Sequence, residues 1–174
     1  AVRSSSSNED GKNKSFAGQY VTELFCGSME FTINSIRKCW KSLLGIGLES
    51  YQDENSENLF GGIIIQKMVN ADYAGIVFTK DPVNNNSDCM IVECCKGVAS
   101  KLVDNRVIPD RYSINKKTFN ITSQGNNDNI PEEKIVELCN VGKELEEYYG
   151  CNVDIEWACR NDNLYLIQCR PITT

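Results

Sequence analysis

The chain has 174 residues, enough for one domain or two small ones, and a hydrophobic content of 41% is enough to form a core. A net charge of -6, without a basic stripe interleaved with aromatic residues, argues against nucleic acid as a partner. No run of eighteen apolar residues occurs, so we expect no membrane span, and the start Ala1-Val2-Arg3 is not a signal peptide. Because an initiator methionine is absent and patterned sequence begins at once, we expect a fragment or a processed chain.

Nine cysteines and no histidine restrict the chemistry of this segment. The cysteines are odd in number, lie mostly in apolar runs and include the adjacent pair Cys94-Cys95, which favours small buried hydrophobes in a reducing, cytoplasmic compartment over disulfides. Without Cys-x-x-Cys spacing or histidine, zinc-finger, Cys-His and serine-triad chemistry are excluded here. The segment also cannot carry a phosphohistidine itself.

Residues 1–14 are polar and turn-prone, a composition typical of a flexible terminus or linker. The loop that follows contains Gly18 and could bring backbone amides to an anion, although one glycine is a weak signal. Helical spacing next predicts an amphipathic core helix from about Met29 to Leu44 that ends near Gly45 or Gly47. Its expected buried stripe is Ile33, Ile36, Trp40, Leu43 and Leu44.

In the middle of the chain, apolar runs bounded by turn residues predict a series of β-strands. Residues 61–69 are expected to form a buried strand that pairs with a second strand, residues 75–79. Residues 90–93 give a third strand, and residues 111–122 give two more around a turn. Strands in hairpins with two helices on one side predict an α+β fold.

A second helix is predicted from Pro131 to Tyr149, with proline in its first turn and Gly150 after its end. Its expected buried stripe is Ile135, Leu138, Gly142, Leu145 and Tyr149.

The last part of the chain, residues 153–171, predicts a β-hairpin whose loop is Asn161-Asp162-Asn163. This loop sets Arg160 opposite Leu164, Ala158 opposite Leu166, Glu156 opposite Gln168, and Asp154 opposite Arg170. Alternation then gives an apolar face made of Ile155, Trp157, Cys159, Tyr165, Ile167 and Cys169.

The other face of the hairpin carries Asp154, Glu156, Gln168 and Arg170. Carboxylate and amide oxygens bind hard divalent cations, and the arginine fork binds phosphate. The same pattern also fits cross-strand pairs on a solvated sheet face, each worth about 0.2 to 1 kcal/mol. Ala158 and Leu166 in the middle of this face indicate that something covers it.

Several motifs along the whole chain carry a family resemblance. They are Ala1-Val-Arg-Ser-Ser5 with Glu9-Asp10, Ser15-Phe-Ala-Gly-Gln19 with Thr22, Ile36-Arg-Lys-Cys-Trp40, Gln66-Lys-Met-Val69, Gly75-Ile-Val-Phe-Thr79 with Asp81-Pro82, Pro109-Asp-Arg-Tyr112, Asp154-Ile-Glu-Trp157 and Gln168-Cys-Arg-Pro171. In this order they resemble the ATP-binding domain of the phosphoenolpyruvate synthase and pyruvate phosphate dikinase family, an ATP-grasp type also found in rifampicin phosphotransferases.

The resemblance implies a partial ATP-grasp domain over residues 1–174, with a phosphate-side segment (1–28) and an antiparallel sheet packed with two main helices (29–174). The residues that match the family's phosphate contacts are Arg3, Gly18 and Thr22, and the matching adenine segment is Gln66, Lys67, Met68 and Val69. Glu156 and Gln168 match the residues that hold Mg2+ beside the phosphates of ATP. Arg3 and Arg170 are the implied catalytic residues, Arg170 by stabilising the transferred charge.

The resemblance further implies that ATP phosphorylates a histidine on a separate swivelling domain, which passes the phosphoryl group to pyruvate or, in antibiotic enzymes, to a hydroxyl. We expect the histidine domain, the acceptor domain and an earlier subdomain with a phosphate-binding lysine elsewhere in the full-length protein. One motif departs from the family: Ser100 replaces an acidic residue, and Ala99 and Asn105 replace glycines. Two alternatives therefore stay open, a nucleotide-binding module without chemistry and an α+β scaffold with an accidental polar face.

Overall fold

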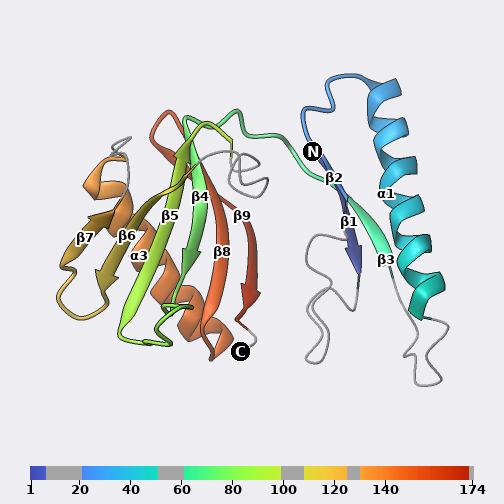
Figure 1. Cartoon of the computed structure of the whole chain (residues 1–174). Helices are drawn as coiled ribbons and strands as arrows, with labels where there is room; N and C mark the ends of the chain where they lie inside the picture. The colour runs from blue at the N-terminus through green and yellow to red at the C-terminus, as the bar shows by residue number, and fades with distance from the viewer. Residues whose placement is uncertain (7–20, 51–60, 99–107, 125–129, 173–174) are drawn as a thin grey trace. The chain divides into compact units, whose positions relative to one another are not determined.

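The chain forms two compact units, Ala1–Met68 and Val69–Ile172 (Figure 1). The computed structural model describes residues 1–6, 21–50, 61–98, 108–124 and 130–172, with only the backbone described for 45–50 and 124. The described strands pair antiparallel in one sheet of three strands and one of six, which confirms the α+β class. However, each unit has its own helix, so the expectation of two helices on one side of a sheet is wrong. No helix in the described ranges is long and apolar enough to cross a membrane.

The first unit contains β1 (Val2–Ser6), β2 (Thr22–Glu23), α1 (Met29–Ser50) and β3 (Gly61–Ile65), with sheet order β2-β1-β3. β1 is the central strand of this sheet. Val2 and Ser4 alternate along it and are both buried. The Cys39 thiol of α1 donates to the Val2 carbonyl at 3.6 Å. The expected flexible terminus is therefore wrong for residues 1–6. Residues 7–14 lie outside the described ranges.

α1 begins where the sequence predicts, and Ser28 Oγ accepts a hydrogen bond from the Phe31 amide in its first turn. It then continues through both glycines to Ser50, since an interior glycine costs only about 1 kcal/mol relative to alanine. The predicted stripe is largely wrong: Leu43 is buried and Ile36 half-buried, whereas the remaining three members are exposed. Among the α1 residues whose side chains are described, 29–44, the buried ones are Ser35, Cys39 and Leu43.

β3 corrects a further expectation. It is not a buried strand, because Ile64 and Ile65 are exposed. It pairs with β1, with Ile63 opposite Ser4, and not with the strand that follows it in the chain. A short apolar run specifies a strand but not its partner, which is set by long-range contacts.

The second unit is a six-stranded sheet with α3 (Glu132–Tyr149) on one face. Its strands are β4 (Tyr73–Phe78), β5 (Cys89–Lys96), β6 (Asp110–Asn115), β7 (Ile121–Gln124), β8 (Val153–Arg160) and β9 (Asn163–Pro171), in the order β7-β6-β5-β4-β8-β9. The core between helix and sheet includes Ile135 and Leu138 of α3 with Val77, Ile155 and Trp157 of the sheet. The sheet therefore has one face buried against α3 and one face turned away from it.

α3 ends where the sequence predicts and begins one residue later, at Glu132. Pro131 is the N-cap residue, and Gly150 ends the helix in the left-handed conformation (φ 67°), with its amide bonded to the Glu146 carbonyl at 2.9 Å. The buried stripe holds Ile135, Leu138 and Gly142, but Tyr149 is exposed, so that part of the expectation is wrong.

The hairpin β8–β9 has a shorter turn than predicted. Only Asn161 and Asp162 form the loop, both with positive φ (47° and 64°), as a type I′ turn requires. Arg160 therefore pairs with Asn163, and the predicted pairs of Arg160 with Leu164 and Ala158 with Leu166 are wrong. Tyr165 lies opposite Ala158 instead, and Leu166 opposite Trp157.

A β-bulge at Ile167 then restores the predicted register. Ile167 is an extra residue in β9 and has no partner in β8. Beyond it Glu156 pairs with Gln168, and Asp154 pairs with Arg170. Ile167 packs with Ala71, Ala74 and Ala158, on the opposite side of the sheet from the α3 core. The prediction that Tyr165 and Ile167 share the face of Trp157 is therefore wrong, for Tyr165 because of the shorter turn and for Ile167 because of the bulge. Leu166, which was expected on the polar face, lies opposite Trp157 instead.

Candidate functional site

The sheet face turned away from α3 collects the polar residues of the hairpin. Because Ile155 and Trp157 lie in the α3 core, their neighbours Asp154 and Glu156 project from the other face. Glu156 is the cross-strand partner of Gln168 on β9 and of Ile76 on β4. Directly opposed residues of an antiparallel pair share a face, so the carboxylate and the amide lie side by side. Their role in binding stays a prediction.

Asp154 and Arg170 form a bidentate ion pair beside these two residues. Arg170 Nε donates to Asp154 Oδ1 at 3.2 Å and Nη2 donates to Oδ2 at 3.1 Å, with both side chains half-buried. Two parallel bonds fix the plane of the guanidinium as well as its position. The sequence offered Asp154 either as one of two carboxylates for a cation or as a member of a cross-strand pair, and the structure shows it paired with Arg170.

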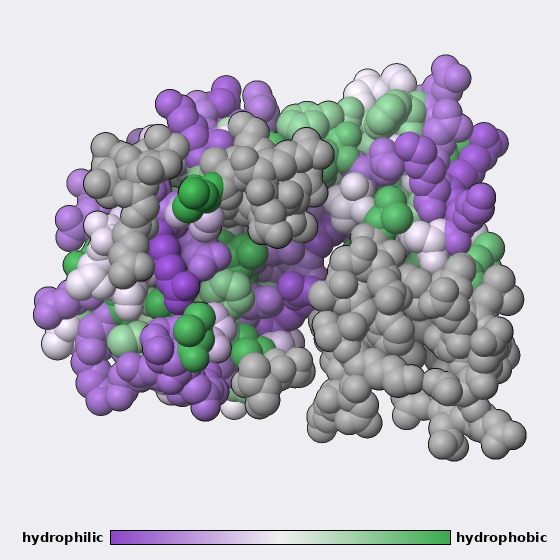
Figure 2. Space-filling view, in the orientation of Figure 1, coloured by the Kyte–Doolittle hydropathy of each residue, from purple (hydrophilic) through white to green (hydrophobic). Residues whose placement is uncertain are grey.

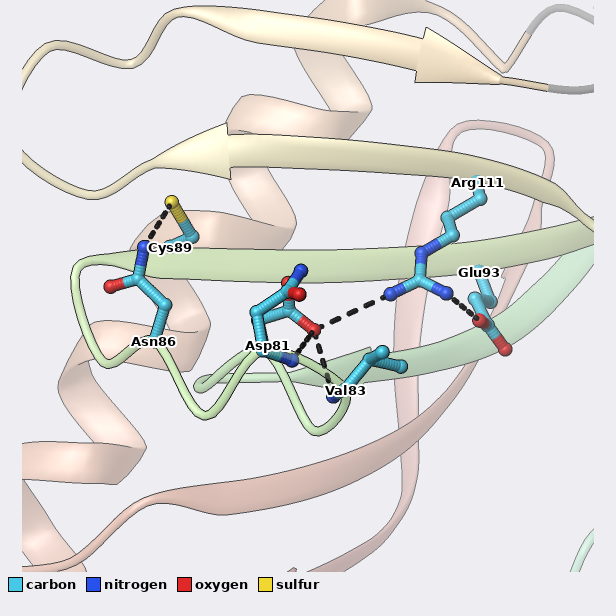
Figure 3. Close-up of polar contacts among 7 residues, drawn as sticks. Asp81, Val83, Asn86, Cys89, Glu93 and Arg111 are labelled. Atoms are coloured by element: carbon cyan, nitrogen blue, oxygen red, sulfur yellow. Dashed lines mark hydrogen bonds and ion pairs between the residues drawn. The ribbon is translucent and has the colours of Figure 1, made fainter.

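A second ionic group lies on the same sheet face (Figure 3). Glu93 of β5 is also a cross-strand partner of Ile76, so Glu93 and Glu156 are in register on either side of β4. Arg111 of β6 lies between two carboxylates, with Nη1 3.7 Å from Glu93 Oε1 and Nη2 3.5 Å from Asp81 Oδ1. The sequence alone did not reveal this group, because it depends on the register of three strands.

Arg111 and Asp81 line a pocket of about 380 Å³ at the β4–β5 loop, together with Ser113 and Thr122. The buried Asp81 carboxylate organises this loop: it accepts hydrogen bonds from the Asn84 side-chain amide at 2.7 Å and from the Val83 amide at 2.9 Å. These donors, with the Arg111 charge, hold the pKa of Asp81 below its usual value against the opposing effect of burial. Asp81 therefore fixes the loop as an ionised carboxylate.

The first unit holds the other predicted site residues that the structure describes, apart from Val69. Arg3 and Thr22 are cross-strand partners on β1 and β2, on the sheet face opposite the buried Val2 and Ser4. Gln66 exchanges backbone hydrogen bonds with Ala1, at 2.9 and 2.8 Å, and Lys67 and Met68 follow it. Val69 belongs to the second unit, where it packs against Ala71, Ala74 and Ala158.

The structure thus brings together Arg3 with Thr22 in one unit, and Glu156 with Gln168 and Arg170 in the other. Gly18 lies outside the described residues, as do Ala99, Ser100 and Asn105. The expected division into a phosphate-side segment (1–28) and a body (29–174) concerns function, and it stays a prediction.

The donor set suits one kind of metal. Among the described residues there is no group of three or more His, Cys, Asp or Glu side chains that could hold an ion. Glu156 and Gln168 offer one carboxylate and one amide oxygen. Mg2+ is commonly bound by one or two carboxylates, with water and substrate phosphates as its other ligands. The pair therefore fits a Mg2+ that arrives with a nucleotide better than an all-protein metal centre.

Comparison with known families identifies the class of protein. Residues 1–129 and 120–174 match the model described as "Pyruvate phosphate dikinase, AMP/ATP-binding domain". Because the match covers the whole chain, the chain belongs to this family of ATP-binding domains from phosphotransferases.

Individual relatives agree with this placement. The chain is 31% identical to a probable phosphoenolpyruvate synthase of Methanocaldococcus jannaschii, 29% identical to an uncharacterized phosphotransferase of Bacillus subtilis, and 31% identical to the rifampicin phosphotransferase of Bacillus cereus. Each similarity covers 100% of this chain, but only 17%, 24% and 23% of the respective relative. The chain therefore corresponds to a fragment of these longer proteins.

Proposed function

We propose that this chain is the ATP-binding part of a phosphotransferase that uses Mg-ATP to phosphorylate a histidine on a separate swivelling domain. The observation that carries the proposal is the juxtaposition of Glu156 with Gln168, beside the Asp154–Arg170 pair, on one sheet face of an ATP-binding domain. A cytoplasmic location, expected from the cysteines, is part of the proposal.

The chemistry needs positioning and charge neutralisation. A bond from phosphorus to a bridging oxygen of ATP breaks as a bond to the imidazole nitrogen forms, with charge spread over the phosphoryl oxygens. Glu156 and Gln168 would hold Mg2+, which when bound neutralises charge on the phosphates. The Arg170 guanidinium, fixed by Asp154, would donate to the transferred group. Arg3 and Thr22 are proposed as phosphate contacts on the family resemblance alone.

The acceptor beyond histidine is proposed to be pyruvate, as in phosphoenolpyruvate synthases. A hydroxyl acceptor is the second candidate, because the identity to the Bacillus cereus rifampicin phosphotransferase, 31%, equals that to the Methanocaldococcus jannaschii protein. A nucleotide-binding module without chemistry is the third, since Ser100 stands where the family resemblance places an acid.

Labelling of the full-length protein with ATP that carries radioactive β and γ phosphates tests the proposal. We expect Mg2+-dependent label on the protein that is stable in base and lost in acid, as a phosphohistidine is. Arg170→Ala should slow its appearance at least tenfold, about 1.4 kcal/mol in activation free energy. Arg160→Ala, which removes the ion pair between Arg160 of the hairpin and Asp72, should label normally. ATP binding without any label would instead establish the module without chemistry.

A further inference from the structure

Exposed apolar side chains are concentrated in the first unit. Of the fourteen large hydrophobic side chains that are exposed in the described ranges, eight lie there, although it is the smaller unit. Figure 2 shows green, apolar surface among the hydrophilic residues of this unit. Four of the eight follow one line along α1 at helical spacing: Met29 (76% exposed), Ile33 (41%), Trp40 (49%) and Leu44 (60%). We call these four residues the α1 stripe.

The α1 stripe is not the side of the helix that packs on the three-stranded sheet. That side consists of Ser35, Cys39 and Leu43, which are buried. Successive residues of a helix are about 100° apart around its axis, so Trp40 and Cys39 face different directions. A helix with one contact surface places its large apolar side chains there. α1 instead packs Ser35, Cys39 and Leu43 against its own sheet and carries four further large apolar residues, exposed, on a second face beside it.

Charge defines what could cover this second face. Arg37 and Lys41 are exposed, lie one helical turn apart and border the α1 stripe next to Ile33 and Trp40. Lys38, farther around the helix, is already paired with Glu23 of the same unit at 3.2 Å. A covering segment therefore needs apolar side chains for the stripe and acidic side chains at the edge formed by Arg37 and Lys41.

The relatives indicate where such a segment comes from. This chain matches over its full length, yet it spans only 17% of the Methanocaldococcus jannaschii protein and 23% of the Bacillus cereus protein. We infer that the α1 stripe is an intramolecular docking surface, covered in the full-length protein by an amphipathic, acid-bearing segment of the same polypeptide outside residues 1–174. The inference is independent of the proposed phosphoryl transfer, because no residue of the stripe belongs to the candidate site.

Photo-crosslinking of the full-length protein tests the inference. Trp40→p-benzoylphenylalanine keeps an aromatic side chain at the centre of the stripe and reacts with whatever lies against it. We expect mass spectrometry to find an intramolecular crosslink from position 40 to a peptide outside residues 1–174 that contains acidic residues. Phe31→p-benzoylphenylalanine, which also replaces an exposed aromatic side chain of the same helix but lies off the stripe, should give little of this product.

Each other product contradicts the inference. A crosslink to a peptide within residues 1–174 would mean that this chain covers its own stripe, and a crosslinked dimer would mean that a second copy does. Absence of any crosslink would mean that the stripe is open to solvent. A stability measurement adds a second readout: Trp40→Lys should lower the Tm of this domain in the full-length protein by about 4 °C or more. Asn34→Lys, exposed on the same helix but off the stripe, should change it by about 1 °C at most.

Discussion

Asp154 and Arg170 face each other across β8 and β9 and share two parallel hydrogen bonds, at 3.2 and 3.1 Å. Glu156 and Gln168 are also directly opposed, and they lie two residues farther along the same strands, on the same face as the pair. Because the carboxylate accepts a hydrogen bond from both Nε and Nη2, it restricts rotation of the guanidinium group. Asp154 is therefore a positioning residue for Arg170. Positioning of this kind affects phosphoryl transfer more than binding of the nucleotide.

Asp154→Asn should therefore separate the two effects. An amide can accept only one of the two hydrogen bonds from Arg170, so the guanidinium loses its fixed plane while its charge remains. We expect the rate of Mg-ATP-dependent labelling to fall at least tenfold, about 1.4 kcal/mol, with a smaller change in the affinity for Mg-ATP. Single-turnover labelling and calorimetry on the full-length protein measure the two quantities.

Asp72→Asn is the matched control for this variant. It weakens the Asp72–Arg160 ion pair near the turn of the same hairpin, on residues outside the candidate site. Its labelling rate should equal that of the unmodified protein. Equal losses in both variants would show that hairpin stability, rather than the orientation of Arg170, controls the rate.

Gly75 allows β4 and β5 to approach closely. A Cβ atom at this position would lie 1.9 Å from the Glu93 carbonyl oxygen, so any side chain forces the backbone of the two strands apart. We expect Gly75→Ala to lower the free energy of unfolding by about 3 kcal/mol or more. Gly62→Ala, in β3, is the control because a Cβ atom there meets nothing within 4 Å, and its effect should stay within about 1 kcal/mol. Urea unfolding compares them, and similar effects of both changes would refute the close approach.

Asp81 predicts a specific dependence of stability on pH. Its pKa is lowered in the folded protein, chiefly by the Asn84 side-chain amide, so ionised Asp81 stabilises the fold above its unfolded pKa of about 3.9. This contribution is lost as the pH falls through the lower folded pKa. Asp81→Asn should therefore be less stable than the unmodified protein at pH 7, and the difference should shrink below about pH 4.

Urea unfolding between pH 7 and pH 3 measures this difference. Asp88→Asn, an exposed change in the same loop that affects only the surface pair with Lys117, is the control and should show a small difference at every pH. If the difference between Asp81→Asn and the unmodified protein did not vary with pH, the ionised carboxylate would not be what holds the loop.

Elements whose ends are marked by local sequence signals, such as proline or glycine, could be predicted from the sequence. α3 has proline at its start and Gly150 at a left-handed end, so both termini were recognisable. The partner of β3 could not be predicted, because a run of isoleucines does not indicate which distant strand it pairs with, here β1 with Ser4 opposite Ile63. The burial of α1 was missed for a similar reason: of the predicted stripe only Leu43 is buried, and the residues buried beside it are the small Ser35 and Cys39.

The candidate site shows the same division. Alternation along two strands predicted that Glu156 and Gln168 face each other, and the hairpin departs from the predicted register in two ways that cancel. The turn is one residue shorter than expected, and the bulge at Ile167 adds one residue back. Bulges are not visible in a period-two pattern. Arg111 and Glu93 were missed because their contact exists only once β4, β5 and β6 are in register.

The central claim is that Glu156 and Gln168 hold the metal of Mg-ATP. Calorimetry of ATP binding to the full-length protein, with and without Mg2+, tests it most directly in the unmodified protein and in Glu156→Gln. The account predicts that Mg2+ strengthens ATP binding to the unmodified protein at least tenfold, about 1.4 kcal/mol, and that this gain is lost in Glu156→Gln while metal-free affinity is retained. An equal gain from Mg2+ in both proteins would contradict the account.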